Sequence, residues 1–472
     1  MSEFQIDPEA TQKLIVEIGI LREENTALRA ENKALRAKVQ ELEEKLNTNS
    51  SNSSKSPSQD PYRKRKGKKK PSGKKQGAQK GHQGRTRAIV PAEEVSEFRE
   101  IHPLLCPDCG GNEFLREPTC TEIRQVTELP EIRPHVIQFN IHTDRCACCS
   151  QVVKADIPRE AESAFGPRLK GFITLLSGEV GVTKRKIVSL IGYLNIKISV
   201  GSVCNIHHLA GKILEGAYET IKEHALEQTA LNADETSWYL KGKRQWLWVI
   251  TGAKSAFFKI DPYRSAEAFQ RVFGEGSQTK PLTTDRFGSY NCYQGPRQYC
   301  WSHVDRDFAK IEERGDIDGL IGKRLKEEAD EVFLYWRYFQ EEHLTRFELQ
   351  TYVETFIVPP LEALMLLGSA GQGLKPKTRG TCKSLLLNFE RLWTYLYHEG
   401  VEPTNNLAER DLRPSVIQRK LSYGTQSEMG SQFIERILSV VVTFKKQARN
   451  TFQYLTDCFQ AYSRDAPIPS PL

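Results

Sequence analysis

This sequence of 472 residues lacks a membrane-spanning apolar run, a secretory signal and the cysteine pattern of a disulfide framework. No stretch approaches the about 18 consecutive apolar residues that a membrane-spanning helix requires. The first ten residues, MSEFQIDPEA, do not resemble a secretory signal. The 11 cysteines are an odd number dispersed along a long chain, which argues against the disulfide framework of a small secreted domain. We therefore expect a cytoplasmic protein with reduced thiols, no membrane contact and several domains.

Acidic residues are also missing from one segment. From Arg63 to Arg87 there are 12 Lys or Arg and no Asp or Glu, after a Ser- and Asn-rich stretch, NTNSSNSSKSPSQD. Such a segment cannot bury a core, so residues 47–90 are predicted to form a disordered arm. The arm either binds DNA phosphates without reading bases or only keeps the protein soluble. The residues assigned to DNA contact are Arg63, Lys64, Arg65, Lys66, Lys68, Lys69, Lys70, Lys74 and Lys75.

The clearest periodic element lies before the arm. Leucine recurs every seven residues at positions 14, 21, 28, 35 and 42, and Asn25 and Asn32 occupy the alternate seam of the same heptads. Charged residues flanking the seam attract one another across a parallel pair of helices. Residues 11–46, within a segment 1–46, therefore predict a two-stranded coiled coil that joins two copies of the chain. The alternative is an amphipathic helix that packs on its own protein.

Two cysteine pairs suggest a structural metal site in residues 91–158. Cys106-Pro-Asp-Cys109 and Cys146-Ala-Cys-Cys149 each have the spacing of a zinc knuckle, and four thiolates hold one Zn²⁺ tetrahedrally. The runs EIRQVTEL and HVIQFNIHT between them resemble strands, so a hairpin is predicted to connect the knuckles in a zinc ribbon. Cys148 is an alternative ligand to Cys146 or Cys149. The competing interpretation is free thiols in a small β-layer.

Residues 159–230 have a helical pattern. TKRKIVSLIGYLNIKISVGSVCNIHHLAG predicts a helix, a short turn and a second helix that starts near Ser199 or Ser202. This order either forms a helix-turn-helix that reads DNA bases or is ordinary helix packing.

Three acidic residues lie in separated stretches with well-defined local structure. Asp234 opens a meander of three strands, LNADETSWYL, RQWLWVITG and SAFFKID, and the second strand, apolar on both faces along WLWVI, is predicted to be central. Asp285 ends a further strand after a helix at 265–274. Glu409 is predicted on a short helix that Pro414 ends; Thr404, Asn405 and Asn406 offer caps, and the spacing of Asn406 to Glu409 fits a capping box. Three such acids gathered on a divalent ion suit metal-assisted phosphodiester chemistry. Glu235 points to the opposite strand face from Asp234, and we expect a structural role for it.

Short sequence motifs around these acids resemble those of a known protein family. ADET, WLWVITG, TDRFGSYN, CWSHVDRDF, NNLAERDLRPSVIQRK and SVVVTFKKQARN resemble the transposases of the insertion-sequence family numbered sixty-six. The resemblance implies an α/β fold with an RNase H-like catalytic core at 231–304 and 401–450 and a DDE triad at Asp234, Asp285 and Glu409. The helical pattern of residues 305–400 then predicts an all-helical insertion between the second and third acids. Residues 451–472 are expected to form a C-terminal tail.

The resemblance also implies the reaction and the partners. The three acids would hold two Mg²⁺ or Mn²⁺ ions, about 4 Å apart, for cleavage at the element's terminal inverted repeats and joining to target DNA, with element-encoded accessory proteins as further partners. Near Glu409, the cations Arg410, Arg413 and Lys420 suit contact with DNA phosphates. His303 is either an accessory group at the metal-bound phosphate or a structural histidine. The alternatives are a nuclease that does not join DNA and a catalytically silent repressor of the element.

Overall fold

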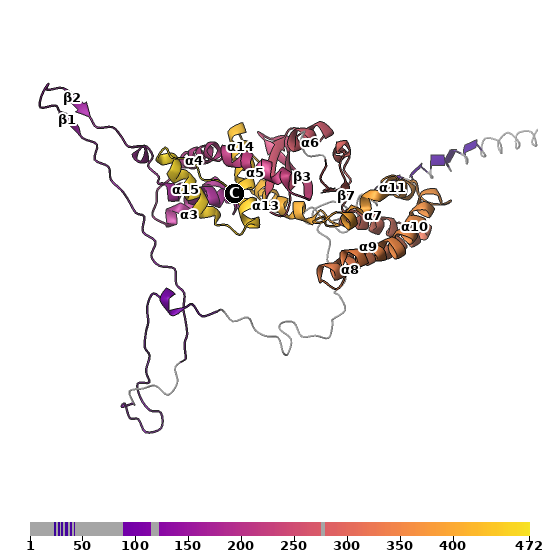
Figure 1. The fold of residues 1–472 in the computed structure, drawn as a ribbon, viewed down its shortest axis with the longest axis horizontal. Coiled ribbons are helices and arrows are strands. Elements are labelled where there is room, and N and C mark those ends of the chain that lie inside the picture. Colours follow the sequence, from indigo (N-terminus) through magenta and orange to yellow (C-terminus); the bar gives the residue numbers. More distant parts are fainter. Residues whose placement is uncertain are drawn as a thin grey trace, which may run out of the picture. The chain divides into compact units, whose positions relative to one another are not determined.

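The computed structural model describes residues 88–114, 122–274 and 279–472, with separate positions between 23 and 42. The chain divides into two compact units. The smaller is made from residues 63–136, and its described part contains one short helix, η2 (Ala92–Glu94). The larger includes residues 137–472 and holds a five-stranded sheet with its helices (Figure 1).

The sheet is mixed, with the order β5-β4-β3-β6-β7. Its first three strands in sequence pair antiparallel, and β6 and β7 then add parallel to β3. The predicted meander, and the central place of its second strand, are confirmed, because β4 lies between β5 and β3. The strand bounds are β3 (Leu231–Leu240), β4 (Lys243–Thr251), β5 (Ala256–Asp261), β6 (Leu282–Thr284) and β7 (Arg297–Tyr299).

Each face of the sheet has its own core, because alternate residues of a strand point to opposite faces. Leu247 and Val249 of β4 pack in one core with α14 (Glu428–Lys446) and α13 (Asn406–Ser422). Trp248 and Ile250 pack on the other face with α6 (Ala266–Phe273), the predicted helix at 265–274. The sheet is therefore covered by helices on both faces.

The edge strand β5 is also covered. Its N–H groups at Ala256, Phe258 and Ile260 donate hydrogen bonds to side chains of α14, namely Thr443, Ser439 and Glu435. The three acceptors are four residues apart, so they lie along one stripe of the helix. The paired N–H groups leave this edge with fewer free groups for another strand to bind.

A helical layer extends the first core. It comprises α2 (Pro167–Gly178), α3 (Lys184–Tyr193), α4 (Val200–Ile213) and α5 (Glu215–Glu227). The expected C-terminal tail is wrong in part, because α15 (Thr451–Ser463) follows α14 and packs against α2, with the rings of Phe172 and Phe452 in edge contact. Tyr454, Leu455 and Phe459 of α15 are buried in this core, and the ring of Tyr454 also contacts Phe444 of α14.

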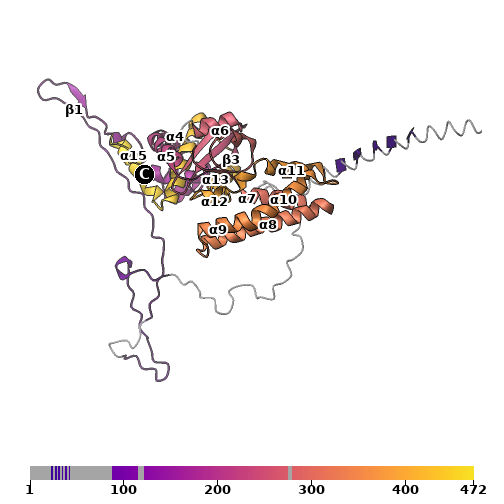
Figure 2. The same ribbon diagram turned by 45° about the vertical axis from the view of Figure 1, so that its right-hand side comes forward.

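Between Asp285 and Glu409 the chain is helical, as predicted for residues 305–400. The helices share a separate core around Trp301, Leu361 and Tyr395, and α8 lies beside α9 and α10 in both ribbon views (Figures 1 and 2). Their bounds are α7 (Trp301–Glu312), α8 (Asp316–Gln340), α9 (Arg346–Tyr352), η5 (Val353–Ile357), α10 (Val358–Ala370), α11 (Pro376–Leu386), η6 (Phe389–Leu392) and α12 (Thr394–Tyr397).

One helical stretch, Arg346–Ala370, is long and apolar enough to cross a membrane by length and composition. It contains no unbroken apolar run of that length, because charged residues such as Glu354 and Glu362 interrupt it. Its buried residues recur every four positions, at 349, 353, 357, 361 and 365, and belong to the core of the helical segment. Core packing accounts for these five residues, whereas Phe347, Phe356, Leu366 and Leu367 of the same stretch are at least 55% exposed.

Candidate active site

Asp234 lies within β3, and Asp285 directly follows the neighbouring parallel strand β6. Asn232 of β3 pairs with Thr283 of β6. Asp234 and Asp285 each follow two residues after these paired positions. Each carboxylate accepts a nearby backbone N–H, from Glu235 at 2.9 Å and from Phe287 at 2.9 Å. The two side chains are therefore oriented by their own backbone on neighbouring strands inside the sheet.

Arg297 of β7 fixes the backbone at Asp285. Its guanidinium is buried and donates to the carbonyl oxygen of Asp285 and to the hydroxyl of Thr284, both at 2.9 Å. Burial lowers the pKa of Arg297 to about 10, which leaves the side chain charged at neutral pH. Arg297 was not identified from the sequence, where it lies between Pro296 and Gln298 outside the matched motifs.

Glu409 reaches the same region from α13, where it lies in the first turn as predicted. Asn405, which precedes the helix, is fully buried and joins it to β3. Its amide nitrogen donates to the carbonyl oxygen of Ala233 at 2.9 Å, and its amide oxygen accepts from Asn232 at 3.1 Å. The backbone of Asn405 also accepts the N–H of Glu409 at 3.1 Å. One buried amide thus connects the helix of the third acid to the strand of the first.

Three details of this helix were predicted wrongly. It is not short, since α13 has 17 residues and continues through Pro414. Asn406 does not cap it, and the N-cap residue Asn405 uses its side chain across to β3 instead. Pro414 removes one helical hydrogen bond, but Leu412, Ser415 and Gln418 are buried around it. Packing of the helix on the sheet offsets the cost of the proline.

Asp234 is the acid of the three whose surroundings favour its neutral form. Burial raises the pKa of Asp234 well above its ordinary value of 3.8, and the negative charges of Glu235, Asp285 and Glu409 raise it further. An isolated surface carboxylate would show no such shift. The negative charges of Asp285 and Glu409 therefore act on Asp234, while the group of three ligand atoms within 4.8 Å that includes Glu409 is formed with Cys300 and His303.

Glu235 has a structural environment on the other strand face. It is buried, accepts from Arg264 Nε at 2.6 Å, and also accepts the hydroxyl of Tyr290. Arg264 in turn lies over the ring of Phe287, with its guanidinium carbon 3.6 Å from the ring centre. This network supports the chain on both sides of Asp234 and Asp285. Neither Arg264 nor Tyr290 was assigned a role from sequence: Arg264 lies in a loop outside the matched motifs, and Tyr290 lies within TDRFGSYN but carries no chemistry that the motif alone points to.

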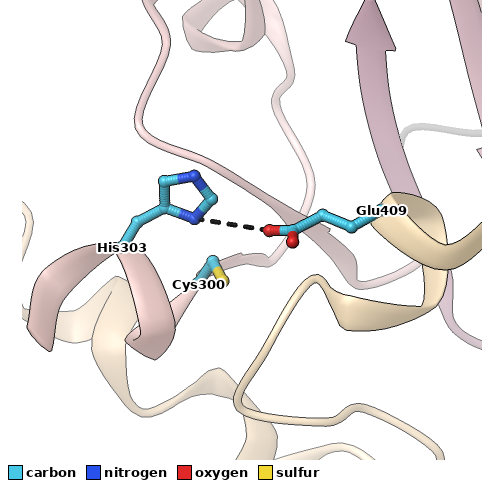
Figure 3. Close-up of side chains that lie close together, drawn as sticks. All are labelled: Cys300, His303 and Glu409. Atoms are coloured by element: carbon cyan, nitrogen blue, oxygen red, sulfur yellow. Dashed lines mark ion pairs between the residues drawn. The ribbon is translucent and has the colours of Figure 1, made fainter. Parts of the chain in front are cut away.

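His303 and Cys300 lie beside Glu409 at the start of α7 (Figure 3). The distance from His303 Nδ1 to Glu409 Oε1 is 3.8 Å, and among the described residues neither atom has a hydrogen-bond partner. The Cys300 sulfur accepts the N–H of Asn405 at 3.1 Å. Burial lowers the pKa of His303 and raises that of Cys300 to about 11, so both groups are neutral at pH 7. His303 is therefore not a satisfied core histidine.

Other acids of these motifs pair with cations. Asp305 contacts Lys326 at 2.8 Å, Asp307 contacts Arg286, and Asp411 contacts Lys446 at 2.9 Å. These three acids belong to the same motifs as His303 and Glu409. In contrast, the predicted phosphate-contacting residues Arg410, Arg413 and Lys420 are exposed on α13.

Cys106 and Cys109 belong to the smaller unit, and Cys146 and Cys149 belong to the larger unit. Cys106 accepts the N–H of Gly110 at 2.9 Å, and Cys146 accepts the N–H of Ser150 at 2.9 Å through their backbone carbonyls. Nearby N–H groups of residues 109 and 149 lower the pKa of Cys106 and of Cys146. Both turns thus favour the thiolate that a metal ligand requires.

The predicted hairpin between the knuckles is wrong for the described residues 122–142, which form no strand. The strands instead flank the second knuckle, as β1 (Thr143–Arg145) and β2 (Val152–Lys154). Val126 and Val136 are 92% and 81% exposed, so the strand-like runs lack the neighbour that a strand needs. Cys120 and the basic residues 63–75 lie outside the described residues.

The predicted helix pair at 184–213 is present as α3 and α4. Ser199 is the N-cap, and its hydroxyl accepts the N–H of Ser202 at 3.0 Å. His207 is a core residue: its ring stacks on Phe433 and bonds Ser177, and burial lowers its pKa to about 3. Lys184, Arg185 and Lys186 are exposed at the start of α3.

Residues between 23 and 42 that the structure describes are helical. Their predicted seam positions are open to solvent in the single chain, with Leu28 57%, Leu35 56% and Leu42 49% exposed. The remaining positions of the predicted coiled coil lie outside the described residues.

Two family profiles match the sequence. The Transposase IS66 family matches residues 163–433, and a family of unknown function (DUF6444) matches residues 5–88. No curated protein matches the chain. The first match contains all three acids, the sheet and the helical segment, and the second contains the heptad and basic segments.

Proposed function

Since the chain belongs to the IS66 family of transposases, we propose that it is a DDE-type transposase that cleaves and joins the ends of an insertion sequence. Membership of the family makes it a DNA-binding, DNA-processing enzyme of transposition. The proposed catalytic residues are Asp234, Asp285 and Glu409. The observation that carries this proposal is the connection of their elements, which supports convergence of the three acids: β3 and β6, which lead to the two aspartates, pair side by side, and Asn405 ties the helix of Glu409 to β3.

We assign the sheet and its helices to the RNase H-like architecture. Three antiparallel strands followed by two parallel ones support this assignment, as does the position of each acid. The first lies on the central strand, the second follows the neighbouring parallel strand, and the third lies on a helix that packs on the sheet. The helical segment between the second and third acids has its own core, so it lengthens the chain without disturbing that convergence.

The three acids fit a hard divalent cation such as Mg²⁺ or Mn²⁺. Carboxylate oxygens are the ligands that these ions prefer, and the crowding of negative charge around Asp234 is costly without a cation. When bound, two such ions supply Lewis-acid activation of the attacking water or 3′-hydroxyl and charge stabilisation of the leaving 3′-oxygen. The chain's own residues would hold the acids in place, through Arg297 at Asp285 and Asn405 at Glu409.

The proposed reaction is an in-line displacement at phosphorus. A water oxygen bonds to phosphorus as the bond to the 3′-oxygen breaks, and in the joining step a 3′-hydroxyl takes the place of the water. Arg410, Arg413 and Lys420, exposed on the helix of Glu409, are positioned to bind phosphates of the DNA backbone. No covalent protein intermediate is required.

The test uses the purified chain, labelled DNA with the element's terminal repeat, and Mg²⁺. Asp285→Asn should abolish cleavage and leave DNA binding intact, because the amide keeps the size of the side chain but loses its charge. Asp305→Asn is the matched control, since Asp305 pairs with Lys326 outside the triad. Unchanged cleavage by Asp285→Asn would refute the assignment. A wild-type chain that cuts without joining is a nuclease, and one that only binds is a repressor.

We further propose that the protein works as a dimer with structural zinc. The exposed leucines at 28, 35 and 42 support pairing of two chains through residues 11–46. The matching turns at Cys106–Cys109 and Cys146–Cys149 support Zn²⁺ binding. A dimer would hold two ends of the element together, and the basic arm at 63–87 would add contacts to DNA phosphates.

A further inference from the structure

Three potential metal ligands meet beside the proposed catalytic acids. Cys300 Sγ, His303 Nδ1 and a carboxylate oxygen of Glu409 all lie within 4.8 Å of one another. Figure 3 shows the imidazole and the carboxylate facing each other, with the cysteine sulfur beside them. Cys300 and His303 come from the start of α7, and Glu409 comes from the first turn of α13. Cys300 and Asn406, the first residue of α13, are 106 residues apart in the sequence.

The gap between His303 and Glu409 has the size of a shared ion. Their separation of 3.8 Å is too long for a hydrogen bond. It is close to twice a zinc–ligand bond of about 2.0–2.1 Å, so both atoms can bind one ion at a wide angle. Among the described residues, both atoms are buried and have no hydrogen-bond partner. Buried polar atoms without partners are uncommon, and an ion is one way to satisfy two at once.

The cysteine is held as a metal ligand would be. Cys300 is fully buried and is the N-cap of α7, with His303 three residues later, so both side chains lie at one end of this helix. The backbone N–H of Asn405 points at the sulfur from 3.1 Å. Such outer contacts orient a ligand and stabilise a thiolate. A sulfur, a nitrogen and a carboxylate oxygen form a donor set for zinc-class ions, whereas Mg²⁺ prefers oxygen alone.

We propose that Cys300, His303 and Glu409 form a second metal site, which binds a zinc-class ion and thereby withdraws Glu409 from the proposed catalytic site. Binding releases the thiol proton of Cys300 to water. Three protein ligands leave one coordination position open. The binding of the ion stands on the cluster itself, and only the competition for Glu409 rests on the proposed function.

The binding test measures zinc per chain in the full-length protein after equilibrium dialysis. Wild type should hold one more zinc ion than His303→Ala or Cys300→Ser, while the knuckle cysteines contribute equally to all three. His343→Ala and Cys292→Ser are matched controls outside the cluster and should equal wild type. Equal zinc in wild type and both cluster variants would overturn the site. If Cys300→Ser does not fold by circular dichroism, His303→Ala and His303→Gln decide the question.

A spectroscopic arm identifies the sulfur. With Co²⁺ in place of Zn²⁺, the difference spectrum between wild type and Cys300→Ser should contain sulfur-to-cobalt charge transfer, because the knuckle signals cancel. A flat difference spectrum would remove Cys300 from the ligand set and contradict the site as proposed.

The competition test adds zinc to the Mg²⁺-dependent cleavage assay. Loss of a direct ligand should weaken zinc binding by about 100-fold or more, so the zinc concentration that halves cleavage should rise by a similar factor in His303→Ala. The cleavage rate of each protein with zinc is divided by its own rate without zinc, so differences in basal rate do not affect the comparison. Equal sensitivity in both proteins would overturn the competition. A wild-type chain that cuts no DNA contradicts the proposed function alone, and the zinc count still decides the site.

Discussion

Asn405→Ala tests whether one buried side chain positions the third acid. The amide of Asn405 donates to the carbonyl oxygen of Ala233 and accepts from the amide of Asn232, at 2.9 and 3.1 Å. Both partners belong to β3, directly before Asp234. The substitution removes both bonds and keeps the backbone contacts that Asn405 makes to Glu409 and Cys300.

The expected loss of stability follows from the groups left behind. Ala233 is 1% and Asn232 8% exposed, so water does not replace the lost bonds freely. A buried polar group without its partner costs about 1–3 kcal/mol, and two such groups give roughly 2–6 kcal/mol. Urea denaturation should show this as a lower midpoint at an unchanged slope.

The expected effect on activity is larger than the effect on DNA binding. Without its tie to β3 the first turn of α13 shifts, and a displacement of about 1 Å of a catalytic group can cost about 100-fold in rate. We expect cleavage of terminal DNA to fall by about that factor and affinity for the same DNA to remain close to wild type. Asn405 is a positioning residue, so the loss should appear in the rate at saturating DNA.

Asn406→Ala is the matched control, because Asn406 is the same residue type, adjacent and exposed. Its stability should stay within about 0.5 kcal/mol of wild type, and its cleavage rate should be unchanged. If Asn405→Ala behaved like this control in both assays, the connection between α13 and β3 would not position Glu409, and the reasoning would be wrong.

Further predictions concern charge, zinc and assembly. Burial and neighbouring acids raise the pKa of Asp234 above 3.8, so its contribution to stability is present at low pH and is lost as pH rises toward its folded-state pKa. Asp234→Asn should therefore raise the melting temperature of the metal-free protein at neutral pH and reduce the further rise that Mg²⁺ produces, measured by scanning calorimetry. Cys146→Ser should lower the zinc content per chain, and elemental analysis showing no change would count against a knuckle site. Leu35→Lys should convert dimers to monomers in analytical ultracentrifugation, whereas Leu387→Lys, also exposed, should not.

Features set by local periodicity were predictable. Alternation along WLWVI identified a strand apolar on both faces, and β4 is the second strand of the sheet with a core on each side. The helical pattern of residues 305–400 likewise appears as α7 to α12. Such patterns are predictable because the residues that make them are neighbours in sequence.

Features that depend on distant partners were not predictable. The strand-like runs at 122–129 and 135–143 have strand composition, but no strand forms across the described residues 122–142. Pro414 was expected to end a helix, and burial of Leu412 and Ser415 keeps that helix intact. A local rule fails wherever tertiary packing contributes more free energy than the local preference.

The sequence by itself determined which acids to consider, the strands and helices that carry them, and the family whose motifs they share. Only the tertiary structure decided that Asn405 connects Glu409 to β3, that Arg297 holds Asp285, and that His303 faces Glu409 without a hydrogen bond. The bonds of Asn405 join residues more than 170 positions apart, and no local pattern records a contact over that separation. The sequence specifies the chemistry of each side chain, whereas the fold determines which distant residues that side chain contacts.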